Sequence, residues 1–170
     1  MTKRSVQHAT FTIERIYPAA PDRVFKAFSD PKAKARWFVG PDNWEKSDHK
    51  MDFRVGGKES VSGGPPGGPV HHYNCTYQDI VPNERIVSVY DMHMDKTKIS
   101  VSLATVEFKP AGTGTRLVLT EQGAFLDGYD DAGSRERGTQ GLLDQLEAAL
   151  GQRPPTVVSA PSGAAPGRTR

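Results

Sequence analysis

Hydrophobic periodicity divides the chain into a strand-rich stretch and one long helix. Between about residues 70 and 122, apolar residues recur at every second position in successive segments, which predicts strands with one buried face. From Gly133 to Leu150 the spacing changes to three and four residues, which predicts an amphipathic helix. Its apolar stripe consists of Leu142, Leu143, Leu146, Ala149 and Leu150. Such a stripe has to be buried, and a sheet built from the strands is the large surface available for it.

Ahead of this stretch, the pattern predicts one further strand and two short helices. Ala9–Tyr17 alternates between apolar and polar residues and is expected to form the first strand. Pro21 suits the first turn of a helix. Ser29-Asp30-Pro31 is typical of the cap of a second helix, which is expected to run to about Trp37.

Six strand segments are expected after the two helices, and short turns between most of them indicate antiparallel neighbours. The segments are Glu45–Val55, Gly57–Ser62, Val70–Ile80, Arg85–Met94, Lys98–Lys109 and Thr115–Gln122. One segment breaks its own alternation, because Ile99, Val101 and Leu103 share one face while Ala104, Val106 and Phe108 share the other. We therefore expect a β-bulge or sharp bend near Leu103–Thr105.

Composition indicates one ordinary domain of the 170 residues, of which 25% are charged and 36% hydrophobic. We expect a flexible N-terminus over residues 1–8, a folded domain over 9–150 and a disordered Pro/Gly/Ala-rich tail over 151–170. The net charge is +2, and three tail arginines account for it (Arg153, Arg168 and Arg170). This distribution argues against a nucleic-acid-binding protein, which usually shows a clustered basic surface.

The single cysteine, Cys75, excludes an intrachain disulfide and fits a reducing compartment. No apolar run is long enough to cross a membrane, and the N-terminus lacks the apolar core of a signal peptide, so a cytoplasmic location is expected. His71 and His72 are adjacent on a strand and point to opposite faces, which argues against a shared metal. No nucleophile elbow, zinc-protease or nucleotide motif is present, and we expect no cofactor, metal or catalytic residue.

The order of strand, two helices, six strands and long helix resembles the START-like helix-grip fold of the SRPBCC superfamily. Within it, the chain is most similar to the AHSA-type family, named for the activator of the heat-shock ATPase. The segments that carry the resemblance are Ala20–Phe25, Asp30-Pro31, Arg36–Phe38, Val55–Gly57, Tyr77–Pro82, Glu84–Val87, Gly114–Leu117 and Thr120-Glu121. The resemblance implies an α+β fold, in which a curved antiparallel sheet of about seven strands wraps round the long C-terminal helix.

A sheet curled round a helix that contains Gly133, Gly138 and Gly141 is expected to enclose a mainly apolar cavity, which suits a small hydrophobic ligand. Members of the resembled family often carry Trp at the position of Thr139, and the smaller residue implies a roomier cavity. Candidate ligand-binding residues are Trp37, Phe38, Phe53, Tyr73, Tyr77, Tyr90, Met92, Met94, Phe125, Tyr129, Thr139, Leu142 and Leu146. The competing interpretation is that these side chains only fill a close-packed core. Likewise Trp37, Phe38 and Trp44 form either a hydrophobic plug or the wall of a ligand mouth.

The resemblance leaves two other functions open. The superfamily includes polyketide cyclase-like and hydrolase-like enzymes, which have few diagnostic residues. The family name also implies a co-chaperone that stimulates a heat-shock ATPase, with a role in stress response. We expect a monomer or weak homodimer, with a small hydrophobic molecule as the leading partner.

Overall fold

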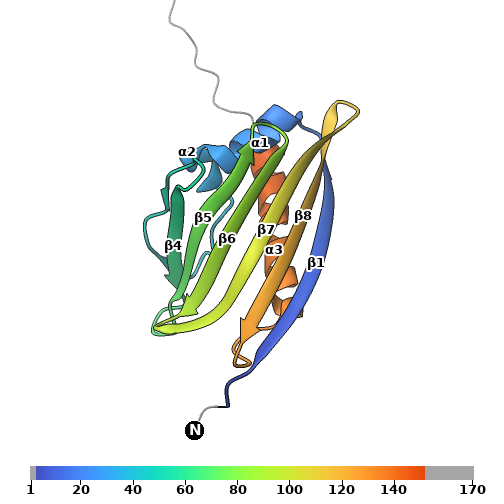
Figure 1. Ribbon diagram of the computed structural model, residues 1–170. Coiled ribbons are helices and arrows are strands. Elements are labelled where there is room, and N and C mark those ends of the chain that lie inside the picture. Colours follow the sequence, from blue (N-terminus) through green and yellow to red (C-terminus); the bar gives the residue numbers. More distant parts are fainter. Residues whose placement is uncertain (1–2, 152–170) are drawn as a thin grey trace, which may run out of the picture.

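The computed structural model describes residues 3–151. Eight strands form one antiparallel sheet in the order β1-β8-β7-β6-β5-β4-β2, with β3 paired to β4, and helix α3 lies against one face of it (Figure 1). The helices are α1 (Pro21–Ser29), α2 (Pro31–Lys34) and α3 (Ala132–Gly151). The strands are β1 (Val6–Tyr17), β2 (Glu45–Lys46), β3 (Lys50–Met51), β4 (Lys58–Gly64), β5 (His71–Val81), β6 (Arg85–Met94), β7 (Thr97–Ala111) and β8 (Gly114–Leu126). This is the helix-grip arrangement that the sequence predicts, and the three predicted helices and their order are confirmed. Helix α2 ends at Lys34, short of the predicted end near Trp37.

Strand β1 forms one edge of the sheet and pairs along β8, from Val6 opposite Leu126 to Tyr17 opposite Thr115. It begins three residues earlier than the sequence analysis expected, so part of the segment predicted to be flexible belongs to the sheet. The predicted tail, from residue 152 onward, lies outside the described residues.

The segment predicted as one strand, Glu45–Val55, instead forms β2 and β3 and then a turn. The backbone N–H of Arg54 donates to the Asp52 carbonyl, and that of Gly57 donates to the Arg54 carbonyl. A Cβ atom at Gly57 would lie 2.0 Å from the Asp52 carbonyl oxygen, so this turn requires glycine. The prediction of a single strand is therefore wrong, and the sheet has eight strands.

The expected bulge near Leu103–Thr105 is also wrong. Pairing of β7 with β6 is regular there. The register shifts closer to the start of β7, where Met92 pairs with Ser100 and His93 pairs with Lys98. Ile99, between these two partners, is the extra residue. Val101 consequently points to the outer face, where it is 37% exposed. The inward positions of β7 are Ser100, Ser102, Ala104, Val106 and Phe108. Alternation misled the prediction because two serines occupy buried positions.

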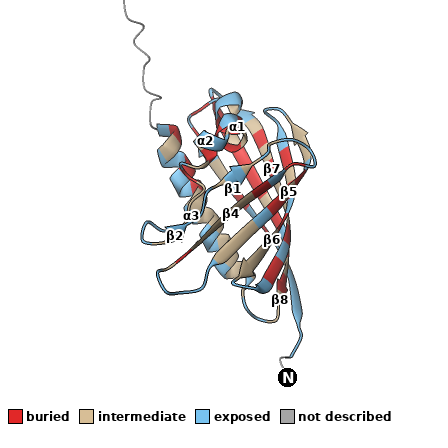
Figure 2. Cartoon of the chain, turned by 90° about the vertical axis from the view of Figure 1, so that its left-hand side faces the viewer, coloured by how far each residue is buried: buried red, intermediate tan, exposed pale blue. Residues whose placement is uncertain are grey.

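Part of the hydrophobic core lies under α1, at the end of the sheet where α3 terminates (Figures 1 and 2). The Phe108 ring packs edge-on against Phe25 and Phe28, with each pair of centroids 5.3 Å apart. The Tyr17 hydroxyl donates to the Leu143 carbonyl at 3.0 Å, and Arg23 donates to the Leu150 carbonyl. These contacts fix the C-terminal half of α3 to the sheet.

We expected the glycines of α3 to leave space beside the sheet, but Gly138 and Gly141 do not face it. Gly138 and Gly141 are exposed, and a Cβ atom on either would meet nothing within 4 Å. They therefore lie on the outer side of the helix and create no internal space. The inward position in the first half of α3 belongs to Arg135, eleven residues or about three turns before Leu146.

Candidate functional site

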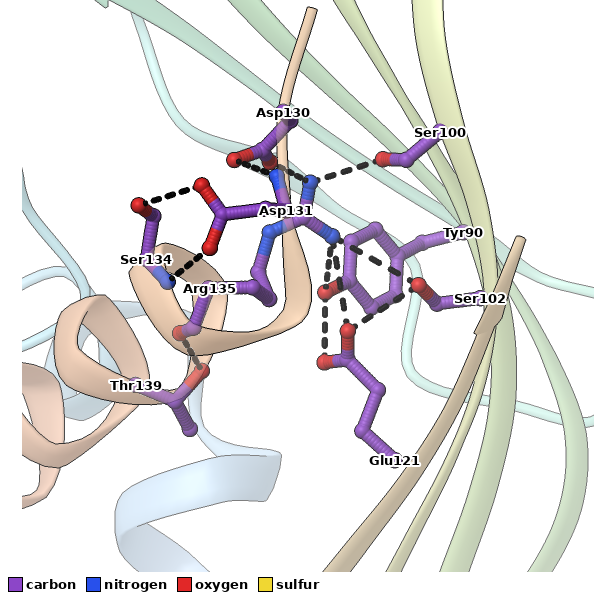
Figure 3. Close-up of polar contacts among 9 residues, drawn as sticks. All are labelled: Tyr90, Ser100, Ser102, Glu121, Asp130, Asp131, Ser134, Arg135 and Thr139. Atoms are coloured by element: carbon purple, nitrogen blue, oxygen red, sulfur yellow. Dashed lines mark hydrogen bonds and ion pairs between the residues drawn. The ribbon is translucent and has the colours of Figure 1, made fainter. Parts of the chain in front are cut away.

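Arg135 extends from α3 to the inner face of the sheet and bonds to residues of several elements (Figure 3). Its side chain is only 11% exposed. One guanidinium nitrogen donates to Ser100 Oγ at 2.7 Å and to Asp130 Oδ2 at 2.6 Å. The other donates to the Tyr90 hydroxyl at 3.0 Å and lies 3.4 Å from Glu121 Oε2. This arginine therefore links the first turns of α3 to β6, β7 and β8.

Glu121 is the buried anion of this cluster, with a side chain only 3% exposed. Tyr90 donates to its Oε1 at 2.6 Å, and Ser102 donates to its Oε2 at 3.0 Å. Burial and the Glu121 carboxylate raise the pKa of Tyr90 well above its ordinary value, so the hydroxyl stays protonated and remains a donor. The guanidinium also lies over the Tyr90 and Phe125 rings, 5.6 and 5.4 Å from their centroids. Both oxygens of Glu121 thus have hydrogen-bond partners.

A second buried polar cluster surrounds Glu59 on the inner face of β4. Its Oε2 accepts hydrogen bonds from Lys34 Nζ and the Tyr77 hydroxyl, each at 2.6 Å. Burial alone would raise the pKa of Glu59, but the Lys34 ammonium and the contacts of His49 and Tyr77 outweigh it and hold the pKa at about 2. The carboxylate is therefore ionised at neutral pH.

An aromatic row joins the two clusters. Lys34 Nζ lies 4.6 Å from the centroid of the Phe38 ring. The Tyr73 ring packs against Phe38 at 5.0 Å and against Tyr90 at 4.9 Å. Burial raises the pKa of Tyr73 well above its ordinary value, yet part of the residue remains exposed. Tyr73 therefore presents accessible aromatic surface between the two clusters.

Comparison with known proteins identifies the family of this fold. A family described as "Activator of Hsp90 ATPase homolog 1-like protein" matches residues 18–151. The chain belongs to this family. No protein with a curated description matches it.

Solved structures of similar proteins support the Hsp90 ATPase activator-like assignment. An uncharacterized protein from Rhizobium leguminosarum is 47% identical, with a TM-score of 0.83 over 88% of this chain and 98% of that one. The Mll3558 protein from Rhizobium loti is 51% identical, with a TM-score of 0.79 over 85% of this chain and 99% of that one. A Chromobacterium violaceum protein is 27% identical, with a TM-score of 0.71 over 85% of this chain and 98% of that one. In none of these comparisons does the match reveal a ligand.

The structure of this activator-like domain separates the predicted ligand-binding residues into groups. Phe38, Tyr73, Met92, Thr139 and Leu142 are partly buried and belong to the inner side of the fold, and Met94 follows them at the end of β6. Tyr90 and Phe125 are buried beneath Arg135. Trp37, Phe53, Tyr77 and Leu146 belong to the packed core or its border. Tyr129 is 43% exposed and lies apart.

Trp37 and Phe38 are adjacent in the sequence but differ in how far they are buried. Trp37 is 3% exposed, and its indole N–H donates to the Ala27 carbonyl at 2.9 Å, so it acts as a core plug. Phe38 is only partly buried and contacts Tyr73. Trp44 stacks on His71 with ring centroids 5.1 Å apart. Of the three aromatic residues, Phe38 is the one that contacts Tyr73.

Sequence reasoning missed the charged residues of both clusters, which are Arg135, Glu121, Asp130, Glu59, Lys34 and His49. A signal was available for two of them. Arg135 continues the Leu142/Leu146 stripe of the helix, and Glu121 continues the alternation of Leu117 and Leu119 on β8. A charged residue at an inward position indicates a buried partner.

Two open hollows of about 410 and 600 Å³ lie elsewhere, on the outer face of the sheet. Both include Val89 and Val101 from outward positions of β6 and β7. The buried polar clusters converge on the opposite face, so we place the candidate site inside the grip. Among the described residues, no group of three or more His, Cys, Asp or Glu side chains could hold a metal. No described helix is long and apolar enough to span a membrane.

Proposed function

We propose that this protein binds a small, mainly apolar molecule in the space around Tyr73, between the first half of α3 and strands β5 and β6. The observation that carries the proposal is that Tyr73 packs between Phe38 and Tyr90 on the inner face and is still partly accessible. Met92 and Leu142 support it, because both face inward and neither is fully buried. Aromatic rings and a methionine suit apolar ligands of varied shape.

The electrostatics favour binding over proton-transfer catalysis. A general acid or base works best with a pKa near the working pH. Here the pKa of Glu59 is held at about 2, while burial moves the pKa values of Tyr73, Tyr77 and Tyr90 upward, away from neutrality. Burial also raises the pKa of the Cys75 thiol, which argues against a nucleophilic role. These groups are suited to fixed hydrogen bonds with a ligand.

The test is binding of the neutral fluorescent probe N-phenyl-1-naphthylamine to purified protein. The wild type is expected to increase probe fluorescence in a saturable manner. Met92→Trp, at an inward position of β6, fills the space and should abolish binding while the protein stays folded by circular dichroism. Val89→Trp adds the same ring to the outer face of the same strand and should leave binding unchanged. Absence of saturable binding to the wild type, or equal effects of the two variants, would contradict the proposal.

The family description supports a second candidate function, stimulation of a heat-shock ATPase in the cytoplasm. This function requires a surface contact and is independent of the inner site. Addition of this protein to a purified Hsp90-type ATPase should raise its hydrolysis rate. An unchanged rate at saturating protein would remove this candidate without affecting ligand binding.

A further inference from the structure

The Glu59 carboxylate uses only one of its two oxygens. Oε2 accepts from both Lys34 and Tyr77, while Oε1 has no hydrogen-bond partner among the described residues. The side chain is wholly buried. A buried charged oxygen without a partner is unfavourable, and proteins rarely leave one in this state.

His49 stands beside this unused oxygen and is itself unpaired. Its Nε2 lies 3.4 Å from Glu59 Oε1 without forming a hydrogen bond, and neither ring nitrogen has a partner among the described residues. The side chain is 10% exposed, so both nitrogens are withdrawn from solvent. A neutral imidazole offers one donor and one acceptor. Two unpaired groups of complementary type therefore face each other.

The pair lies at one end of the proposed binding site. The His49 ring is 6.2 Å from Phe38, and Phe38 is 5.0 Å from Tyr73, where the centroids of the rings are compared. His49 is carried by residues 47–49, the short connection between the two-residue strands β2 and β3. The His49 ring therefore lies over Glu59 Oε1 from this connection.

The charges decide which ligand group fits between these two residues. The Lys34 ammonium already neutralises the Glu59 carboxylate, so neither a cation nor an anion gains much attraction there. An apolar end would leave both Oε1 and the imidazole unpaired. A hydroxyl can pair with Oε1 and with one ring nitrogen, because its O–H donates and its oxygen accepts.

We propose that the inner site takes an apolar molecule with a terminal hydroxyl, an alcohol or a phenol, whose O–H donates to Glu59 Oε1 and whose oxygen accepts from His49 Nε2. The inference rests on the proposed function and adds the chemical class of the ligand. It also makes His49 a specificity-determining residue of the site.

The test compares two probes of equal shape, 2-naphthol and 2-methylnaphthalene, as competitors of N-phenyl-1-naphthylamine. The wild type should bind 2-naphthol at least about tenfold more tightly, since a hydrogen bond to a charged group contributes about 1.5–3 kcal/mol. In His49→Phe the preference should fall to less than about threefold. The control, His72→Phe, changes a histidine on the outer face and should keep the preference. A second variant, Glu59→Gln, should also weaken the preference if it folds.

The outcomes separate the two proposals. If both probes bind the wild type equally, hydroxyl recognition is overturned while ligand binding stands. The same holds if His49→Phe keeps the full preference for 2-naphthol. If neither probe nor the fluorescent reporter binds, both the proposed function and this inference are wrong.

Discussion

Replacement of Arg135 by methionine tests whether the first half of α3 is held to the sheet by a buried ion pair. Methionine is a long, flexible apolar side chain and removes the guanidinium without leaving a large void. The change eliminates the hydrogen bonds to Tyr90, Ser100 and Asp130, and it leaves Glu121 without its cation. The carboxylate stays where it is, 3% exposed.

The magnitude follows from the burial of this carboxylate. Removal of one partner of a buried ion pair typically costs about 3–5 kcal/mol, because an uncompensated charge remains. Glu121 keeps its hydrogen bonds from Tyr90 and Ser102, which places the expected loss near the lower end, about 3 kcal/mol. Arg137→Met on the same helix is the control. Arg137 is exposed, and its side chain donates one hydrogen bond to Ser134 at the surface, so its replacement should change stability by less than about 0.5 kcal/mol.

The assay is urea denaturation at pH 7, with the free energy of unfolding obtained by linear extrapolation. A double variant, Arg135→Met with Glu121→Leu, removes both charges and should recover a large part of the loss. A loss below about 1 kcal/mol in Arg135→Met would refute the reasoning. It would mean that water reaches Glu121 and screens the charge.

Three further changes address the other parts of the site. The folded-state pKa of Glu59, about 2, lies below the unfolded value of about 4.3. Its contribution to stability is therefore complete above about pH 5 and declines as the pH falls, so the stability gap between the wild type and Glu59→Gln should narrow from pH 5 to pH 3 in urea denaturation. A constant gap would contradict this. Thr139→Trp loses the hydrogen bond from the threonine hydroxyl to the Arg135 carbonyl and should fill the inner space. The variant is expected to have a higher melting temperature and no probe binding. A lower melting temperature with unchanged binding would show that the space lies elsewhere. Asp131→Ala removes the acceptor for the Ser134 backbone N–H at the start of α3 and should lower the melting temperature by a few degrees, whereas Asp131→Asn should retain most of it. Equal melting temperatures for the three proteins would show that this cap does not stabilise α3.

The sequence by itself determined the elements whose pattern is local. The stripe of leucines located α3 to within one residue at each end, because a helix places residues three and four apart on one face. Alternation located β5 and β6 in the same way, and short turns made their neighbours antiparallel. The order of these elements was enough for the helix-grip fold. These inferences needed no knowledge of which strand would face which residue of the helix.

Only the tertiary structure decided which polar residues are buried. Ser100 and Ser102 read as outward positions of β7, yet they face inward because Arg135, 35 and 33 residues away, supplies their partner. Lys34 and Glu59 are 25 residues apart and are buried together. A polar side chain enters the interior only if another group satisfies it there. That partner comes from a distant segment, so the pairing cannot be predicted from the periodicity of the sequence around either residue.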